Sequence, residues 1–356
     1  MKKYIGLEEM SNVNCSSVLN VIRNCGSVSR RQISDITGLS WGGMTKIVNK
    51  LFSHGYIVEE KDTSASGVGR TPALIRINDK KNVVIGLDLN REGFAAHVMN
   101  LCGEVLERFS EEVSFQGKEE LLQVILRFTG RIVPGYKEKN ILSIAVAMQG
   151  AVDAEKGISV KFPHCPDWEN VPVREILQQE FGIPVFVEHD PDCMLHAMLK
   201  NEECENMLLF RLDRSIGMAA SVNGEIIRGN GLLEVAHCIA VPGGKPCRCG
   251  KKGCIEAYLA PSLESGRLNE EALQELLDPL AVFMYNMMRV FHSETIILTG
   301  KLMKYRTAFE KELLNRFYQY CEKSEARVKL VEETELAVEG AALTAVEGAV
   351  DLIQIS

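Results

Sequence analysis

The sequence GNGLLEVAHCIAVPGGKPCRCGKKGCIEAY, residues 229–258, holds a dense group of chemically distinctive side chains. Its cysteines Cys247, Cys249 and Cys254 lie within eight positions, and the glycines between them permit tight backbone turns. His237 stands ten positions before the first of these cysteines. Three thiolates and one imidazole fill a tetrahedral coordination sphere and leave no open position, so this pattern predicts a structural Zn²⁺ site.

The alternative interpretation of this stretch is a group of buried or redox-active thiols. Cys247 and Cys249 are poorly placed for a disulfide with each other, and a reducing compartment opposes any disulfide. Cys238, directly after His237, is a spare candidate ligand. We interpret it as a small core residue, because neighbouring residues rarely point to the same side. The sequence therefore favours zinc held by His237 and the three later cysteines.

The composition indicates a soluble globular protein. Hydrophobic residues make up 46% and charged residues 25% of the 356, and this length allows two or three domains. The sequence has no run of eighteen apolar residues and no signal-peptide pattern at its N-terminus, so we expect no membrane insertion. Eleven cysteines without a disulfide framework fit a reducing compartment. The expected location is the cytoplasm.

The charge is distributed unevenly along the chain. Residues 1–80 carry eleven Lys and Arg against seven Asp and Glu, which is about +4, whereas the whole chain has a net charge of −8. The remainder therefore carries −12. A small basic segment joined to a large acidic body suggests that only the first segment meets nucleic acid.

Residues 29–51 have the pattern of a helix-turn-helix. Ser29 and Gln32 form a Ser-x-x-Gln capping box that opens one helix, and Gly38 stands where its C-cap is expected. Ser40 caps the next helix. The apolar face of that second helix is formed by Met44, Ile47, Val48 and Leu51. The second helix of such a pair normally enters the major groove of DNA.

Two apolar segments, 56–58 and 74–77, flank a polar loop and predict the strands of a wing. Thr and Asn can read base edges, Lys can meet phosphates, and an Arg in the loop can reach a minor groove. The expected DNA contacts are Ser40, Trp41, Thr45, Lys46, Asn49, Lys50 and Arg70. The alternatives are a winged helix used for protein contacts and a Trp41 that only packs.

From residue 81 the pattern alternates between strands and helices. Two groups of three strands are each followed by helices, which predicts two similar α/β lobes. Helices are expected at 119–131, 270–291, 305–323 and 335–349. The expected domains are 1–80, which would bind DNA, and 81–356, with lobes of roughly 81–190 plus the C-terminal helix and 191–335.

Two stretches resemble the ROK family of sugar kinases and sugar-responsive repressors. SRRQISDITGLSWGGMTKIVNKLFSHGYIVEE with GVGRTP is similar to the winged-helix domain of its repressors of the N-acetylglucosamine and xylose type. CRCGKKGCIE with EVAH upstream is similar to the family signature. The resemblance implies a winged helix-turn-helix followed by two ribonuclease-H-like lobes of the actin/hexokinase type. It also implies a zinc on His237, Cys247, Cys249 and Cys254 beside a sugar pocket.

The resemblance also implies a set of sugar-binding residues. Asp190, in the stretch Glu-His-Asp-Pro-Asp, matches the acid that deprotonates the sugar hydroxyl in the kinases and binds it in the repressors. His189 replaces the usual Asn of that stretch. The complete expected sugar-binding set is His189, Asp190, Glu234, His237 and Glu256. The loop that is usually Gly-x-Pro-Gly is Ala-Met-Gln-Gly here, at 147–150.

The family's nucleotide-binding turns are altered in this sequence. The phosphate turn Asp-x-Gly-Gly-Thr-Lys appears as Asp-Leu-Asn-Arg-Glu-Gly at 88–93, and the second turn appears as Asp-Arg-Ser-Ile-Gly at 213–217. Phosphate turns need small residues, so that backbone N–H groups can approach the anion. The bulk and negative charge of these side chains argue against phosphoryl transfer. We therefore expect no catalytic residues.

The expected function is a sugar-responsive transcriptional repressor of carbohydrate-metabolism genes, without enzyme activity. It would bind a palindromic operator as a homodimer or homotetramer, with a sugar or sugar derivative as effector. One alternative is an active sugar kinase with an added DNA-binding domain, which Asp190 supports. Another is a repressor controlled by a protein partner, which the unusual His189 and Gln149 support.

Overall fold

The computed structural model describes residues 7–61, 73–163, 165–200, 202, 204–228, 235–264, 267–332 and 335–353. The chain divides into two compact units. Unit 1 comprises Met1–Val146, Pro172–Phe186 and Ala341–Ser356, and unit 2 comprises Ala147–Val171 and Val187–Gly340. This division into compact units does not test the domain boundaries expected from the sequence, which stay predictions.

The N-terminal part of unit 1 is a winged helix-turn-helix. Its helices and strands are α1 (Leu7–Cys25), β1 (Val28–Ser29), α2 (Arg30–Thr37), α3 (Trp41–His54), β2 (Ile57–Lys61) and β3 (Ala73–Ile77), with the sheet order β1-β3-β2. The expected capping box is confirmed, since the Ser29 hydroxyl accepts from the Gln32 backbone and the Gln32 side chain accepts from the Ser29 backbone. Gly38 and Gly55 end α2 and α3 in left-handed conformations, with φ of 68° and 76°.

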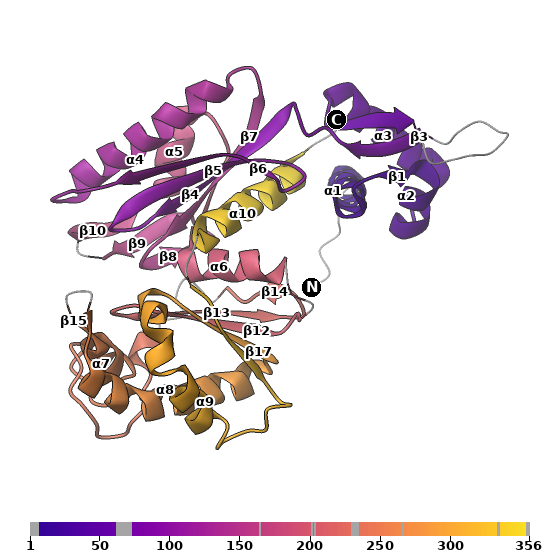
Figure 1. Ribbon diagram of the computed structural model, residues 1–356. Coiled ribbons are helices and arrows are strands. Elements are labelled where there is room, and N and C mark those ends of the chain that lie inside the picture. Colours follow the sequence, from indigo (N-terminus) through magenta and orange to yellow (C-terminus); the bar gives the residue numbers. More distant parts are fainter. Residues whose placement is uncertain are drawn as a thin grey trace. The chain divides into compact units, whose positions relative to one another are not determined.

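The rest of unit 1 is built on a five-stranded sheet with the order β11-β7-β4-β5-β6. Its elements are β4 (Asn82–Leu89), β5 (Gly93–Asn100), β6 (Val105–Glu112), α4 (Lys118–Ile132), η1 (Val133–Tyr136), β7 (Asn140–Met148), α5 (Val173–Phe181), β11 (Val185–His189) and α10 (Leu336–Leu352). Figure 1 shows α4 and α5 on one face of this sheet and α10 on the other. Gly86 allows α10 to lie close, because a Cβ there would be 2.3 Å from the Ala342 nitrogen.

The winged helix and α10 share one hydrophobic core within unit 1. Val18, Leu19 and Ile22 of α1 belong to the same buried cluster as Ala345 and Val346 of α10. The Ser16 hydroxyl donates to the Val350 carbonyl at 3.0 Å. Helix α1 of the winged helix-turn-helix therefore packs directly on the last long helix of the chain.

Unit 2 contains a second five-stranded sheet, with the order β14-β13-β12-β17-β18, and a smaller sheet with the order β10-β9-β8. Its strands are β8 (Ala151–Asp153), β9 (Ile158–Phe162), β10 (Cys165–Val171), β12 (Met207–Leu212), β13 (Ile216–Val222), β14 (Glu225–Ile226), β15 (Leu263–Glu264), β16 (Arg267–Leu268), β17 (Thr295–Thr299) and β18 (Arg327–Leu330). Its helices are α6 (Asp190–Leu199), η2 (Val235–His237), α7 (Glu256–Leu259), η3 (Ala260–Ser262), α8 (Glu270–Phe291), η4 (Lys301–Ala308) and α9 (Glu310–Phe317).

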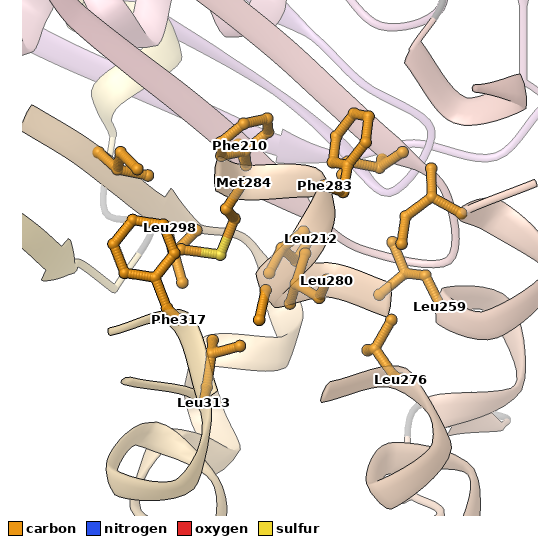
Figure 2. Close-up of a cluster of buried hydrophobic side chains, with 14 of the residues drawn as sticks. Phe210, Leu212, Leu259, Leu276, Leu280, Phe283, Met284, Leu298, Leu313 and Phe317 are labelled. Atoms are coloured by element: carbon orange, nitrogen blue, oxygen red, sulfur yellow. The ribbon is translucent and has the colours of Figure 1, made fainter. Parts of the chain in front are cut away.

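The core of unit 2 lies where α8 and α9 cover the sheet. Phe210 and Leu212 of β12 meet Phe283 and Met284 of α8 and Phe317 of α9, and all five side chains are at most 3% exposed (Figure 2). The helix expected at 305–323 is shorter than predicted. A 3-10 segment, η4, takes its first part, and α9 ends at Phe317. Phe309, with φ −138° and ψ −16°, separates the two, and a further kink at Tyr305 lies inside η4.

The two large sheets share one strand order. Each begins with three consecutive antiparallel strands. The fourth strand lies beside the first of the three, and the fifth lies beside the fourth. The expected fold class is confirmed, namely α/β with a winged helix-turn-helix and two ribonuclease-H-like lobes. No helix in the described part of the chain combines the length and apolar character that crossing a membrane requires.

Candidate functional site

The four expected zinc ligands come together in unit 2. Each of these residues offers one ligand atom, and these four atoms all lie within 4.8 Å of one another. The residues are His237, Cys247, Cys249 and Cys254. The Cys249 and Cys254 sulfurs are 3.6 Å apart, and the Cys247 sulfur lies 3.6 Å from the His237 Nδ1 atom. A tetrahedral zinc with Zn–S bonds of about 2.3 Å requires an S···S separation of about 3.8 Å. The donor set and its spacing therefore fit one zinc ion.

Local backbone contacts hold the cysteines in place. The Cys247 N–H donates to the Lys251 carbonyl at 2.8 Å and closes the turn between the first two cysteines and the third. Gly253 has a φ of 85°, and a Cβ there would lie 1.7 Å from the Val241 carbonyl oxygen. Only glycine fits this position, because both the conformation and the close approach exclude a side chain.

The thiols differ in their readiness to lose a proton. Burial raises the pKa of the Cys254 thiol to about 12, whereas the Lys251 backbone N–H lowers the pKa of the Cys249 thiol. A buried thiol with so high a pKa becomes a thiolate only when a cation compensates its charge. Cys238, the spare candidate, packs half-buried against the hydrophobic core of unit 2, as the sequence suggested.

Glu256, an expected sugar contact, begins α7 directly beside the cysteine cluster. Its carboxylate is 3% exposed and accepts from Arg248 Nε at 3.0 Å and Arg248 Nη2 at 2.7 Å. The Ser215 hydroxyl donates to the same carboxylate at 2.8 Å. The His237 Nδ1 atom lies 3.6 Å from Glu256 Oε2. The pair His237 and Glu256 thus connects the expected zinc ligands to the expected sugar pocket.

Asp190, the second expected sugar-binding carboxylate, begins α6 and is also held by an arginine. Arg211 of β12 donates to its Oδ2 atom, and Arg211 Nε lies 3.1 Å from an Asp213 oxygen. Burial raises the pKa of Asp190 to about 6 although Arg211 opposes this shift. Burial, with the Arg211 charge, lowers the pKa of the neighbouring His189 to about 4, so this imidazole is neutral near pH 7.

The first turn of α6 adds a third carboxyl group. Asp192 is 9% exposed, and its Oδ1 atom has no hydrogen-bond partner among the described residues. Burial and the negative Glu188 raise the pKa of Asp192 to about 8. Glu188 itself pairs with Arg228, whose Nε lies 3.1 Å from both of its oxygens.

The turn at residues 88–93, in unit 1, is occupied by its own side chains. The Asn90 amide oxygen accepts from the backbone N–H groups of Glu92 at 3.0 Å and Gly93 at 3.2 Å. The Asn90 amide nitrogen donates to Asp88 at 3.2 Å. Backbone N–H groups of this kind bind phosphate in nucleotide-binding turns. Here they are already satisfied by an amide.

In the corresponding turn of unit 2, residues 213–217, the first side chain satisfies a backbone N–H outside the turn. The Asp213 carboxylate accepts from the backbone N–H of Lys301 at 2.7 Å, at the first residue after Gly300. Gly300 has a φ of 98°, and a Cβ there would lie 2.9 Å from the same Asp213 oxygen. The first N–H of η4 is therefore already satisfied by a carboxylate of the chain.

Six of the seven expected DNA contacts lie in α3 or at its N-cap. Trp41, Lys46 and Asn49 are exposed on α3, and Lys50 is partly exposed there. Ser40 caps α3 by accepting from the Gly43 N–H at 3.3 Å. Thr45 differs from expectation, because its hydroxyl oxygen is buried and has no hydrogen-bond partner in the described part of the chain. Arg70 and the sugar-site residue Glu234 lie outside the described residues.

Sequence reasoning missed the arginines that hold the two carboxylates. Arg211 stands inside the otherwise apolar strand Met-Leu-Leu-Phe-Arg-Leu, and an arginine there is a signal of a buried anionic partner. Arg248 lies between two expected metal ligands, Cys247 and Cys249, and nothing in the sequence indicates which way its side chain points. Ser215 is 41 positions from Glu256, so its contact could not be read from local spacing.

Comparison with known proteins gives consistent matches. The model of the ROK family matches residues 84–354. The xylose repressor of Caldicellulosiruptor bescii is 24% identical over 348 residues, which cover 85% of this chain and 87% of the repressor. The DNA-binding transcriptional dual regulator NagC of Escherichia coli is 29% identical over 255 residues, which cover 70% of this chain and 62% of NagC.

Two solved structures show the same fold. A ROK family transcriptional regulator, a homologue of the E. coli Mlc protein, has a TM-score of 0.82 at 21% identity and covers 97% of this chain and 99% of its own. A ROK hexokinase from Thermus thermophilus has a TM-score of 0.62 at 23% identity and covers 74% of this chain and 97% of its own. The hexokinase match leaves about a quarter of this chain uncovered.

Proposed function

Because the chain belongs to the ROK family, we propose that it is a sugar-responsive transcriptional repressor of carbohydrate-metabolism genes without kinase activity. One observation carries the proposal: a winged helix is joined to kinase-like lobes whose two phosphate turns are filled by Asn90 and Asp213. Xylose repressors and NagC are similar to this chain over most of its length, which supports the assignment.

DNA binding is assigned to α3 and the wing. Trp41, Lys46 and Asn49 provide the exposed contacts, Lys50 adds a cation, and Arg70 is proposed as the wing contact. Ser40 contributes by fixing the start of α3. The protein would act in the cytoplasm as a homodimer or homotetramer on a palindromic operator, because paired half-sites mirror a two-fold symmetric protein.

The sugar effector is assigned to unit 2, at His189, Asp190, Glu234, His237 and Glu256. A structural Zn²⁺ on His237, Cys247, Cys249 and Cys254 would fix the loop that carries Glu256. The free energy of zinc binding would add to the folding stability of this loop, because the four ligands come together only in the folded protein. The metal has no reaction to perform in this proposal.

The test combines a gel-shift titration on the protein's own promoter region with an ADP-release assay on common hexoses and aminosugars. We expect operator binding that a specific sugar weakens, and no ADP release above background. A protein that never binds this DNA, at any sugar concentration, would rule out the repressor. Turnover of ATP with a sugar would instead establish the kinase.

The pairing of both expected sugar carboxylates with arginines also favours a second candidate. In it the protein is a repressor that answers to a protein partner, and Asp190 and Glu256 serve only to stabilise unit 2. Thermal-shift measurements with a sugar panel distinguish the two. A sugar that stabilises the protein specifically contradicts the second candidate, since a ligand of the folded state raises its stability.

A further inference from the structure

The Arg248 side chain covers the Glu256 carboxylate and shields it from solvent. The Glu256 side chain is 4% exposed, whereas that of Arg248 is 76% exposed, and the two share hydrogen bonds of 3.0 and 2.7 Å. Ser215 supplies a third donor at 2.8 Å. A ligand hydroxyl that reaches Glu256 from solvent must therefore replace Arg248.

Arg248 can leave this position, whereas Arg211 is held on Asp190. Arg211 is 8% exposed and lies between two carboxylates, Asp190 and Asp213. Arg248 is anchored on one carboxylate only among its described ion pairs, and its exposed guanidinium can return to water without being buried elsewhere. Of the two arginines, Arg248 is the one that a ligand can displace.

Displacement of Arg248 changes the charge balance of the site. The Glu256 carboxylate then has no arginine partner, and its remaining ion-pair contact among the described residues is His237 at 3.6 Å, an expected metal ligand. A buried carboxylate that loses its cation is strongly destabilised. A neutral hydroxyl restores a hydrogen bond without restoring the charge. A protonated amine restores both, and charge-assisted hydrogen bonds are about twice as strong as neutral ones.

We propose that the site selects a sugar carrying a protonated amino group, and that Arg248 is the specificity-determining residue that enforces this choice. The inference rests on the proposed sugar-responsive function and names the class of its effector. Neutral hexoses displace Arg248 poorly, and acidic sugars are repelled by the Glu256 carboxylate. The ammonium group takes the place of the Arg248 guanidinium on Glu256.

The experiment is isothermal titration calorimetry with glucosamine, mannosamine and galactosamine, each beside its parent hexose and its N-acetyl derivative, and with glucuronate as the anion. The pH is kept low enough to protonate the amines. In the wild type we expect one amino sugar to bind about tenfold more tightly than its parent hexose. Arg248→Gln should raise the affinity for the parent hexose and reduce this preference. Glu256→Gln should abolish it, because a neutral amide requires no counter-charge.

Lys251→Gln is the matched control, since it removes a nearby exposed charge of the same loop and should keep the preference. Zinc content and melting temperature are measured for every variant, so that loss of structure is seen separately from a change of preference. A wild type that binds a hexose or glucuronate as tightly as the amine overturns the inference and leaves the repressor proposal standing. Persistence of the preference in Glu256→Gln also overturns it. If no sugar binds to the wild type or to Arg248→Gln, both the inference and the sugar-responsive function fail.

Discussion

Replacing Asp192 by Asn should stabilise unit 2, and the gain should grow as the pH rises. Asp192 is 9% exposed and one of its oxygens has no hydrogen-bond partner among the described residues. Burial and the negative Glu188 raise its pKa from the ordinary 3.8 to about 8. The folded protein therefore retains a proton that the unfolded chain releases, and unfolding is favoured as the pH rises between these two values.

The size of the effect follows from the pKa difference. Within this window the free energy of unfolding falls by about 1.4 kcal/mol for each pH unit, and less as the folded pKa is approached. Between about pH 6 and pH 8 the wild type should lose about 2 kcal/mol that Asp192→Asn keeps, because the amide cannot ionise. For a unit of this size the difference corresponds to about 4–8 °C in melting temperature.

Differential scanning calorimetry of both proteins across this pH range gives the measurement. Asp278→Asn serves as control, because its side chain is 72% exposed and it should show no pH-dependent gain. The decisive quantity is the difference in melting temperature between Asp192→Asn and the wild type, and how this difference changes with pH. If that difference is the same at about pH 6 and pH 8, Asp192 does not hold a proton in the folded state and the reasoning is refuted.

Three other substitutions test the remaining parts of the chain. Lys46→Ala should weaken operator binding and lower the salt slope, measured by fluorescence anisotropy, by about one unit, whereas Lys80→Ala should not. Cys249→Ser should reduce zinc content in mass spectrometry and lower the melting temperature, whereas Cys238→Ser should retain the metal, and equal zinc in both would contradict the ligand set. Gly340→Ala should destabilise unit 2 by about 3 kcal/mol in urea unfolding, because its Cβ would lie 1.7 Å from the Cys193 carbonyl oxygen. Gly135→Ala, with nothing within 4 Å, should be neutral.

The features that could be predicted from the sequence are those fixed by short spacing. The capping box at Ser29 and Gln32, the ends of α2 and α3 and the close approach of the four zinc ligands all depend on residues near one another in the chain. Thr45 shows the limit of periodicity. It lies next to Met44 and three residues before Val48, both fully buried, so its hydroxyl is drawn to the inner side of α3.

The contacts that could not be predicted join distant positions. Arg211 and Asp190 are 21 positions apart, and Ser215 and Glu256 are 41 apart. Each contact needs the β12–β13 hairpin to be placed beside α6 and α7, and this placement depends on the whole sheet of unit 2. The small sheet β8–β10 was not predicted either, because β8 has only three residues and both pairings of the sheet are irregular.

The β12–β13 hairpin links the expected nucleotide end of unit 2 to the expected sugar carboxylates. Arg211 holds Asp190, Asp213 satisfies the Lys301 N–H, and Ser215 supports Glu256. Asp213→Gly would free the N–H at the start of η4 for a phosphate. It would also remove one of the two carboxylates beside the buried Arg211, whose charge would then draw more strongly on Asp190. Strand β12 and the turn after it support both expected sugar carboxylates, through Arg211 and Ser215. Asp213→Gly should therefore weaken sugar binding as well as open the start of η4.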